Sequence, residues 1–452
     1  MNTQAFSFRR SYFLRPTCFA LLFCLLFSAC RKQDHSKPPP QHNADVVDKW
    51  MTMQLRLMRN ATGIPNQAFS RHFAYSGVTA LGAMLPVLEN RSWIDRLNGL
   101  TGMPIEKHWK NYFMPANVNA ALAAINRSFF PNASAIDKSA IDSLEAALKN
   151  EFLSTQPASV IATSEKFGQD VATAVFNWAE TDGYKNAGAP YTPPIGPGLW
   201  KPTPPAFAPA STPYWGANRT IIDGSLHGLR LPAPPAYSIE PASDFFKMVK
   251  VVYDSSQSLT DDQKAMAIFW RDVPGPTTPG HWLSIVQQVV KQKKTTLENA
   301  ALGYALTGAA VNDVLIACFK AKYEHNLLRP VTYIREVMGQ TGWNSFIATP
   351  AHPEYPSNHA ALSIAAAEVM EYVFGKLGSL TDHTNDYLGQ APRNYSSFKA
   401  IGEEAGQSRV YGGIHYQFSV DRSFELGRQV VKNILPPKFS HREDDDRGPN
   451  KD

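Results

Sequence analysis

The chain has 452 residues, of which 44% are hydrophobic, so it is long enough to bury a large core. Its formal net charge is +5, but three of its arginines fall in the first 29 residues, and without them 41 basic side chains stand against 39 acidic ones. A remaining charge near +2 gives no reason to expect nucleic acid as a partner.

The first segment has the layout of a secretory signal peptide. Arg9, Arg10 and Arg15 precede the apolar run CFALLFCLLFSA, which is too short to span a bilayer comfortably. The run ends in LLFSAC, which resembles a bacterial lipobox with Cys30 as the lipid acceptor. We therefore predict a lipoprotein signal peptide over residues 1–29, export, and attachment to the bacterial cell envelope only through a lipid on Cys30. An uncleaved apolar anchor is the alternative.

The cysteines leave no pair for an internal disulfide. Cys18 and Cys24 belong to the predicted leader and Cys30 would be acylated, so Cys318 remains alone in a helical pattern. Residues 30–44 are polar and contain prolines, which predicts a flexible tether. Residues 436–452 predict a charged, disordered tail.

Between these ends the chain is predicted to be all-α. Apolar residues recur at spacings of three and four, which is typical of amphipathic and buried helices. The segments with this pattern are 44–60, 67–89, 139–153, 167–183, 259–273, 281–292, 296–328 and 395–411, and an alanine-rich run follows Pro356. Strand alternation is scarce, so we expect a helical-bundle core and one domain over residues 45–435.

Residues 191–220 break the helical pattern. This segment, YTPPIGPGLWKPTPPAFAPASTPYWGANRT, contains too many prolines for a helix. A flexible linker is one interpretation. We favour a long ordered loop, because Trp200, Phe207, Tyr214 and Trp215 are aromatic anchors that a linker would not need.

Two cations stand seven residues apart in the segment KAKYEHNLLRP. That spacing is nearly two helical turns, so Lys322 and Arg329 would leave almost the same face of one helix before Pro330 stops it. A shared anion is one interpretation of this pair, and a solvated basic face is the other.

The segment HPEYPSNH, residues 352–359, predicts the start of a helix. Pro356 suits a first turn because it lacks an N–H that would be unpaired there. The next N–H groups have no intrahelical partner, and together with the helix dipole they form a site for an oxyanion. Ser357 would add a hydroxyl donor and His359 an acid or base. Alternatively, Ser357 only caps the helix and His359 is an exposed residue of its first turn.

A third candidate pair, Arg409 and His415, lies six residues apart in SRVYGGIHYQFSVD. Gly412 and Gly413 permit a turn between them, so that Arg409 ends one helix and His415 begins the next element. Structural pairing is the alternative for each of the two residues alone.

Taken in order, the patterns Lys-x6-Arg-Pro, Pro-Ser-x-His and Ser-Arg-x5-His resemble the type 2 phosphatidic acid phosphatase and vanadium haloperoxidase superfamily. The similarity to its bacterial vanadium-dependent haloperoxidase-like group extends over roughly residues 45–435, with the motifs inside 313–430. The resemblance implies an all-helical fold and one site that takes vanadate or phosphate.

The resemblance also implies a role for each motif residue. Five of them would hold the oxyanion by charge or hydrogen bonds, namely Lys322, Arg329, Ser357, Asn358 through its main-chain N–H, and Arg409. His415 would bind vanadium or attack phosphorus, His359 would be the acid/base, and Lys322 would polarise hydrogen peroxide.

Three positions qualify the resemblance. Asn358 stands where the family usually has glycine, and Ser419 where it often has an aspartate that orients the last histidine, so Ser419 or another group must orient His415. His352 occupies a position where bromo- and iodoperoxidases often carry histidine, which favours bromide or iodide over chloride unless His352 is purely structural. Asp272 is placed either near the mouth of the pocket or in the core, and core packing is the favoured interpretation.

These features favour a vanadate-dependent haloperoxidase that oxidises halide with hydrogen peroxide to hypohalous acid, which then reaches an organic acceptor. The first alternative is a soluble periplasmic acid phosphatase that acts through a phosphohistidine, because phosphate shares the charge and shape of vanadate and competes for the same site. The second is a non-enzymatic envelope lipoprotein with a weakened site.

Overall fold

The computed structural model describes residues 38–88, 91–106, 108–272 and 275–435. The predicted signal peptide, Cys30, most of the predicted tether and the predicted charged tail lie outside these residues.

Almost all of the regular secondary structure in the described part of the chain is helical, which confirms the predicted all-α class. Its helices are α2 (Asp45–Asn60), α3 (Ala68–Gly82), α4 (Met114–Phe129), α5 (Ala135–Leu153), α6 (Ala158–Ala179), α7 (Asp244–Ser256), α8 (Asp261–Phe269), α9 (Thr277–Lys293), α10 (Leu297–His325), α11 (Pro330–Glu336), α12 (Asn358–Phe374), α13 (Phe398–Tyr411) and α14 (Gln417–Ile434). Two short strands, β1 (Leu380–Asp382) and β2 (Arg393–Tyr395), pair antiparallel. Every segment predicted to be helical overlaps one of these helices, whereas α4, α7, α11 and α14 were missed.

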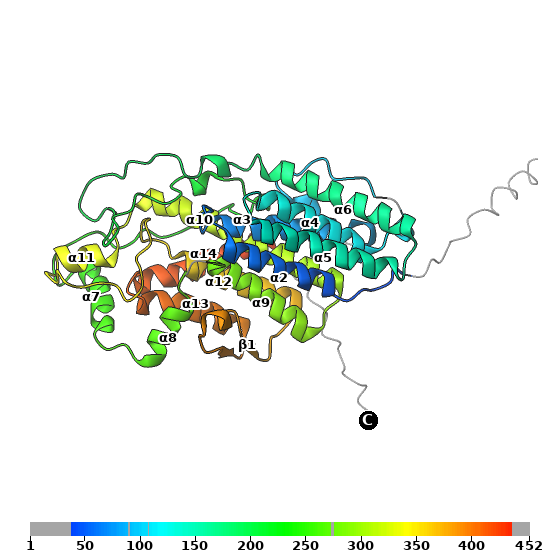
Figure 1. Cartoon of the computed structure of the whole chain (residues 1–452). Helices are drawn as coiled ribbons and strands as arrows, with labels where there is room; N and C mark the ends of the chain where they lie inside the picture. Colours follow the sequence, from blue (N-terminus) through cyan, green and yellow to red (C-terminus); the bar gives the residue numbers. More distant parts are fainter. Residues whose placement is uncertain (1–37, 89–90, 107, 273–274, 436–452) are drawn as a thin grey trace, which may run out of the picture. The chain divides into compact units, whose positions relative to one another are not determined.

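Helix α10 is central to the packing: it lies against α3 on one side and α12 on another, and α12 packs in turn against α13 and α14 (Figure 1). The crossing of α3 and α10 is close because a Cβ atom at Gly77 would lie 2.6 Å from the main-chain oxygen of Tyr304. Among the described residues, α10 is also the one helix long and apolar enough to cross a membrane, and 94% of its most apolar window is buried within the fold.

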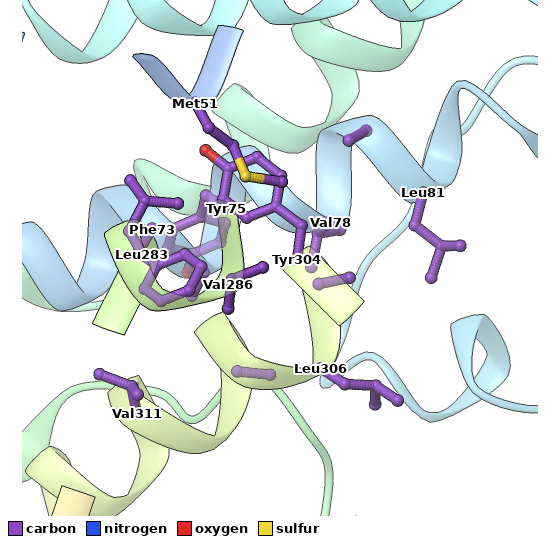
Figure 2. Close-up of a cluster of buried hydrophobic side chains, with 14 of the residues drawn as sticks. Met51, Phe73, Tyr75, Val78, Leu81, Leu283, Val286, Tyr304, Leu306 and Val311 are labelled. Carbon is purple, nitrogen blue, oxygen red and sulfur yellow. The ribbon is translucent and has the colours of Figure 1, made fainter. Parts of the chain in front are cut away.

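Side chains from α2, α3, α9 and α10 meet in the core, where Met51, Phe73, Leu283 and Tyr304 lie together (Figure 2). All four are buried, and removing such side chains from water is the main favourable term in folding. This core holds α10 in place, and the candidate site lies at the C-terminal end of α10, where Lys322 belongs to the last turns of the helix.

The proline-rich segment 191–220 is an ordered loop, as predicted. Trp200 and Trp215 are fully buried, but Phe207 is 62% exposed and Tyr214 is 42% exposed, so these two were wrongly predicted as anchors. The loop is attached to the rest of the chain by main-chain hydrogen bonds as well.

Two of these main-chain bonds reach the segments that carry the sequence motifs. The N–H of Trp200 donates to the carbonyl of Asn326 at 2.6 Å, and the N–H of Ser211 donates to the carbonyl of Ala351 at 2.7 Å. The loop therefore covers the end of α10 and the segment that leads into α12.

Candidate functional site

Arg329 connects the separated motifs. Its Nε donates to the carbonyl of His352 at 2.9 Å, and its Nη1 donates to the carbonyl of Ile414 at 2.9 Å. The same Nη1 lies 3.4 Å from Nε2 of His415. One buried guanidinium thus fixes the segment before α12 next to the turn between α13 and α14.

The prediction that Lys322 and Arg329 share one helix face is wrong. Helix α10 ends at His325, because Asn326 adopts a left-handed φ of 47°. Pro330 begins α11 instead of ending α10, and Arg329 is the residue before it. The two cations still lie close enough for the charge of Arg329, together with burial as the larger cause, to lower the pKa of Lys322 well below its ordinary value.

The ammonium group of Lys322 is fully hydrogen-bonded to main chain. It donates to the carbonyls of Pro353 and Glu354, both at 2.9 Å, and to the carbonyl of Pro356. Three acceptors require three N–H donors, which only the charged form of lysine has. Lys322 therefore brings its charge to the site and holds the segment that precedes α12, while its donors are occupied.

The first turn of α12 carries donors that no described residue satisfies. The Ser357 hydroxyl is completely buried, has no hydrogen-bond partner among the described residues, and does not cap the helix. The first main-chain hydrogen bond of α12 runs from the N–H of Ala361 to the carbonyl of Ser357, so the N–H groups of Asn358, His359 and Ala360 come before it and have no i−4 partner in the helix. Since buried polar groups are nearly always paired, this turn has the character of an anion site, and the capping interpretation of Ser357 is wrong.

Asn358 is an ordinary helical residue at the start of α12, and it is absent from the residues with positive φ in the described chain. Its main-chain N–H therefore takes the direction that a glycine in a helix would give it. The substitution of glycine by asparagine costs no backbone strain here.

His359 is buried, with 7% of its surface exposed, so the alternative of an exposed first-turn residue is wrong. Its Nε2 lies 2.6 Å from the Thr278 hydroxyl and 3.1 Å from the Trp270 carbonyl. Nη1 of Arg409 lies 3.3 Å from the same Nε2, so this nitrogen faces both a carbonyl acceptor and a guanidinium donor, and these contacts hold the ring in place without selecting one tautomer. Burial, followed by the charge of Arg409, lowers the pKa of His359 to about 3, so the ring is a neutral proton acceptor.

His415 is held by a carboxylate that the sequence analysis did not assign. Its Nδ1 donates to Oε1 of Glu354 at 2.7 Å, and the other oxygen of Glu354 accepts from the Ser419 hydroxyl at 2.7 Å. The lone pair of the imidazole is therefore on Nε2, on the side of Arg329. Burial, and next the charge of Arg329, lower the pKa of His415 well below its ordinary value, so the ring stays neutral.

Glu354 belongs to the motif HPEYPSNH, and its one available signal was an acidic residue among prolines and histidines that flank a predicted anion site. Burial raises the pKa of Glu354 to about 7, against the opposing effect of Arg329.

His352 lies in the same place and is also buried. Its Nδ1 lies 2.9 Å from Nη2 of Arg329, which can only donate, and 3.2 Å from the carbonyl oxygen of Pro353, which can only accept. The ring centroid is 5.3 Å from that of Phe319. His352 is thus held by Arg329 on one edge.

A cavity of about 380 Å³ gives access to these groups. Its lining includes His352, Asn358, His359, His415 and Asp272. A neighbouring cavity of about 530 Å³ shares Asp272 and His359 with it and also reaches Arg409. The lining of the first cavity does not include Lys322, Arg329 or Ser357, which lie behind its wall.

Asp272 lines the cavity, so the favoured interpretation of core packing is wrong and the alternative, a place near the pocket, is correct. One of its carboxylate oxygens lies 3.6 Å from Nε2 of His359 and accepts a hydrogen bond from Thr278 at 2.9 Å. Asp272 therefore supports the imidazole of His359 at the wall of the cavity.

The donor set fits an oxyanion. The described residues contain no group of three or more His, Cys, Asp or Glu side chains that could hold a bare metal ion. They do bring together three buried cations, Lys322, Arg329 and Arg409, and the unsatisfied hydroxyl of Ser357. Buried positive charges are costly without compensation, and a bound phosphate-like anion would supply it.

Comparison with known proteins agrees with this geometry. Residues 303–441 match the protein family described as the VCPO second helical-bundle domain. A structure described as the first bacterial vanadium-dependent iodoperoxidase matches with a TM-score of 0.78 and 29% identity, over 89% of this chain and 98% of that one. The chain is similar to the bacterial vanadium haloperoxidases. The resemblance stated from the motifs is thereby confirmed.

This haloperoxidase-like protein is also similar in fold to a bacterial vanadium-dependent chloroperoxidase. Its holo-type structure gives a TM-score of 0.62 at 18% identity, and its apo-type structure gives 0.60 at 17% identity. Both cover 81% of this chain, and the matches span 90% and 92% of the chloroperoxidase chains. A search of curated proteins found no match.

Proposed function

We propose that this haloperoxidase-like protein is a vanadate-dependent haloperoxidase that oxidises iodide or bromide with hydrogen peroxide. The observation that supports it most is the state of His415: a buried, neutral imidazole whose Nδ1–H is held by Glu354, so that Nε2 is available as a ligand beside the guanidinium of Arg329.

Each residue of the site has a proposed part in holding vanadate. Nε2 of His415 would bond to vanadium, and the buried charges of Lys322, Arg329 and Arg409 would neutralise its oxygens. The Ser357 hydroxyl and the N–H of Asn358 would donate hydrogen bonds to them. When bound, vanadate supplies a Lewis acid that activates hydrogen peroxide toward attack by halide. Phosphate has the same charge and shape and would compete.

The proton chemistry falls to His359. Its neutral ring is held at Nε2 by Thr278, the Trp270 carbonyl and Arg409, and a neutral imidazole at the wall of the cavity can take up a proton and return it. Asp272 opposes the loss of basicity caused by burial, because its negative charge favours the protonated ring. Lys322 would polarise the peroxide through its charge, since its N–H donors are occupied by main-chain carbonyls.

Iodide or bromide is the proposed halide because of His352. This residue lines the cavity, its Nδ1 edge is held by Arg329, and an imidazole N–H on its other edge would be a donor for a bound halide. The similarity to an iodoperoxidase at 29% identity points the same way. Hypohalous acid would be the product, and an organic molecule its acceptor. We also propose that the enzyme works outside the cytoplasm, anchored to the cell envelope through Cys30.

The test is reconstitution of the full chain with orthovanadate, dialysis and metal analysis, followed by assays with hydrogen peroxide and iodide, bromide or chloride. We expect one bound vanadium and oxidation of iodide or bromide. His415→Ala should lose both vanadium and activity, whereas His359→Ala should keep vanadium and lose activity.

A parallel assay of phosphate-ester hydrolysis uses the vanadate-free protein. Hydrolysis there, combined with no response of the vanadate-loaded protein to peroxide, would favour the phosphatase alternative. Vanadate binding without either activity would contradict an enzymatic function.

A further inference from the structure

We propose that Glu354 is the positioning residue for His415. Glu354 lies in the segment before α12, and it orients the imidazole in place of an aspartate at position 419. This inference rests on the proposed function only for its consequence for vanadate. The orientation of the His415 ring can be measured without any anion.

The main chain of Glu354 is fixed on both sides. Its N–H donates to the carbonyl of Leu327 at 2.9 Å, and its own carbonyl accepts from the ammonium of Lys322 at 2.9 Å. The carboxylate of Glu354 is completely buried. A side chain held in this way has few alternative positions, which is what orientation of a partner requires.

The carboxylate accepts three hydrogen bonds. Oε1 accepts from Nδ1 of His415 at 2.7 Å and from the N–H of Tyr416 at 3.0 Å, and Oε2 accepts from the hydroxyl of Ser419 at 2.7 Å. Oε1 acts as an acceptor toward the N–H of Tyr416. A lone pair on Nδ1 of His415 would be repelled by this oxygen, whereas a hydrogen on Nδ1 forms a hydrogen bond with it. The arrangement therefore selects the tautomer with hydrogen on Nδ1 and leaves Nε2 free.

Helix α14 connects this carboxylate to the anion site. The main-chain oxygen of Ser419 accepts from the Ser423 hydroxyl at 2.5 Å, and that hydroxyl accepts from the N–H of Ser357 at 2.7 Å. The first two turns of α14 thus hold both Glu354, through Ser419, and the start of α12, through Ser423.

The position of Ser419 explains why Ser419→Asp alone would not improve the orientation of His415. Its hydroxyl is 2.7 Å from Oε2 of Glu354, so a carboxylate there would place two like charges together in a buried site. A carboxylate at either position is compatible with the geometry, but carboxylates at both are not. Glu354→Ala/Ser419→Asp is therefore the matched exchange.

The first measurement is the tautomer of His415 in the anion-free full chain, from the ¹⁵N chemical shifts of its imidazole, assigned with His415→Gln. The wild type should show hydrogen on Nδ1. Glu354→Ala should lose this preference, and Glu354→Ala/Ser419→Asp should recover it. Glu354→Gln should keep it, because the amide oxygen can accept both N–H groups while its NH₂ donates to Ser419.

The second measurement is the affinity for orthovanadate alone. Partners of metal-bound histidines typically contribute about 10- to 100-fold to affinity, so Glu354→Ala should bind vanadate that much more weakly. Glu354→Gln should fall between Glu354→Ala and the wild type, since it keeps the hydrogen bond and loses the charge. The double variant should bind at least about tenfold more tightly than Glu354→Ala.

The outcomes separate the two proposals. A wild-type tautomer and wild-type vanadate affinity in Glu354→Ala would overturn the role of Glu354, whether or not the protein oxidises halide. A shifted tautomer in Glu354→Ala, in a protein that never oxidises halide, would contradict the proposed function and leave the positioning role intact. If Glu354→Ala does not fold, the double variant Glu354→Ala/Ser419→Asp should restore folding. Failure to do so would contradict the claim that a carboxylate at position 419 can replace Glu354.

Discussion

Replacing Ser357 by alanine is expected to stabilise the anion-free protein and at the same time to weaken its binding of vanadate. The Ser357 hydroxyl is completely buried and has no hydrogen-bond partner among the described residues. A buried polar group left unpaired costs about 1–3 kcal/mol, and Ser357→Ala removes that cost together with a single oxygen atom. We therefore expect the free energy of unfolding to rise by about 1 kcal/mol.

The effect on binding has the opposite sign. A hydrogen bond to a charged group contributes about 1.5–3 kcal/mol, so loss of the Ser357 hydroxyl should weaken vanadate binding about 10- to 150-fold. The assays are urea denaturation of the vanadate-free full chain and calorimetric titration with orthovanadate.

Helix α12 itself provides the control. Ser363 is equally buried, but its hydroxyl accepts a hydrogen bond from Nε1 of Trp282 at 2.8 Å. Ser363→Ala leaves that N–H unpaired and should destabilise the protein by about 1–3 kcal/mol with little effect on vanadate affinity. If Ser357→Ala destabilises as much as Ser363→Ala and binds vanadate like the wild type, Ser357 is a structural residue and the reasoning is refuted.

Asn358→Pro should lower halide oxidation about 100-fold or more, because it removes one donor to the oxyanion, while Asn358→Gly should stay within about tenfold of the wild type; comparable rates for the two variants would contradict a role for the N–H. His352→Asn keeps an acceptor for Arg329 and should raise the KM for iodide. His352→Phe should also weaken vanadate binding, because it leaves the Arg329 donor unpaired. Steady-state kinetics with each halide measure the first effect, and vanadate titrations measure the second. Burial lowers the pKa of His72 to about 3 from 6.5, so the unfolded chain binds a proton that the folded chain does not, and the free energy of unfolding should fall between pH 6.5 and 3. His72→Gln should make that decline shallower by about 1.4 kcal/mol per pH unit in urea titrations, and equal slopes would contradict it. Mass spectrometry of the exported protein should find an acylated Cys30 as the first residue, and an intact Met1 terminus would exclude the lipoprotein.

The helical class was predictable because burial of apolar residues in this chain follows the helical period over long stretches. Helix α2 illustrates this, since Val47, Trp50 and Met51 are buried at helical spacing, whereas α10 was recognisable from the length of its apolar run. Helix α11 has only seven residues and begins at Pro330, so its pattern was too short to detect. Helix α14 was missed although its buried face is regular, because polar side chains such as Gln417 and Asp421 dominate its start.

The sequence by itself determined which residue types are available at the site, through Lys322, Arg329, Arg409 and the two histidines of the last two motifs, and their order along the chain was enough to name the family. Only the tertiary structure decided how they meet. Arg329 reaches His415 because Asn326 turns the chain out of α10, which no helical spacing predicts. The carboxylate that orients His415 comes from Glu354, 61 residues earlier in the chain, because a hydrogen bond depends on distance in space and leaves no trace in the local pattern of either segment.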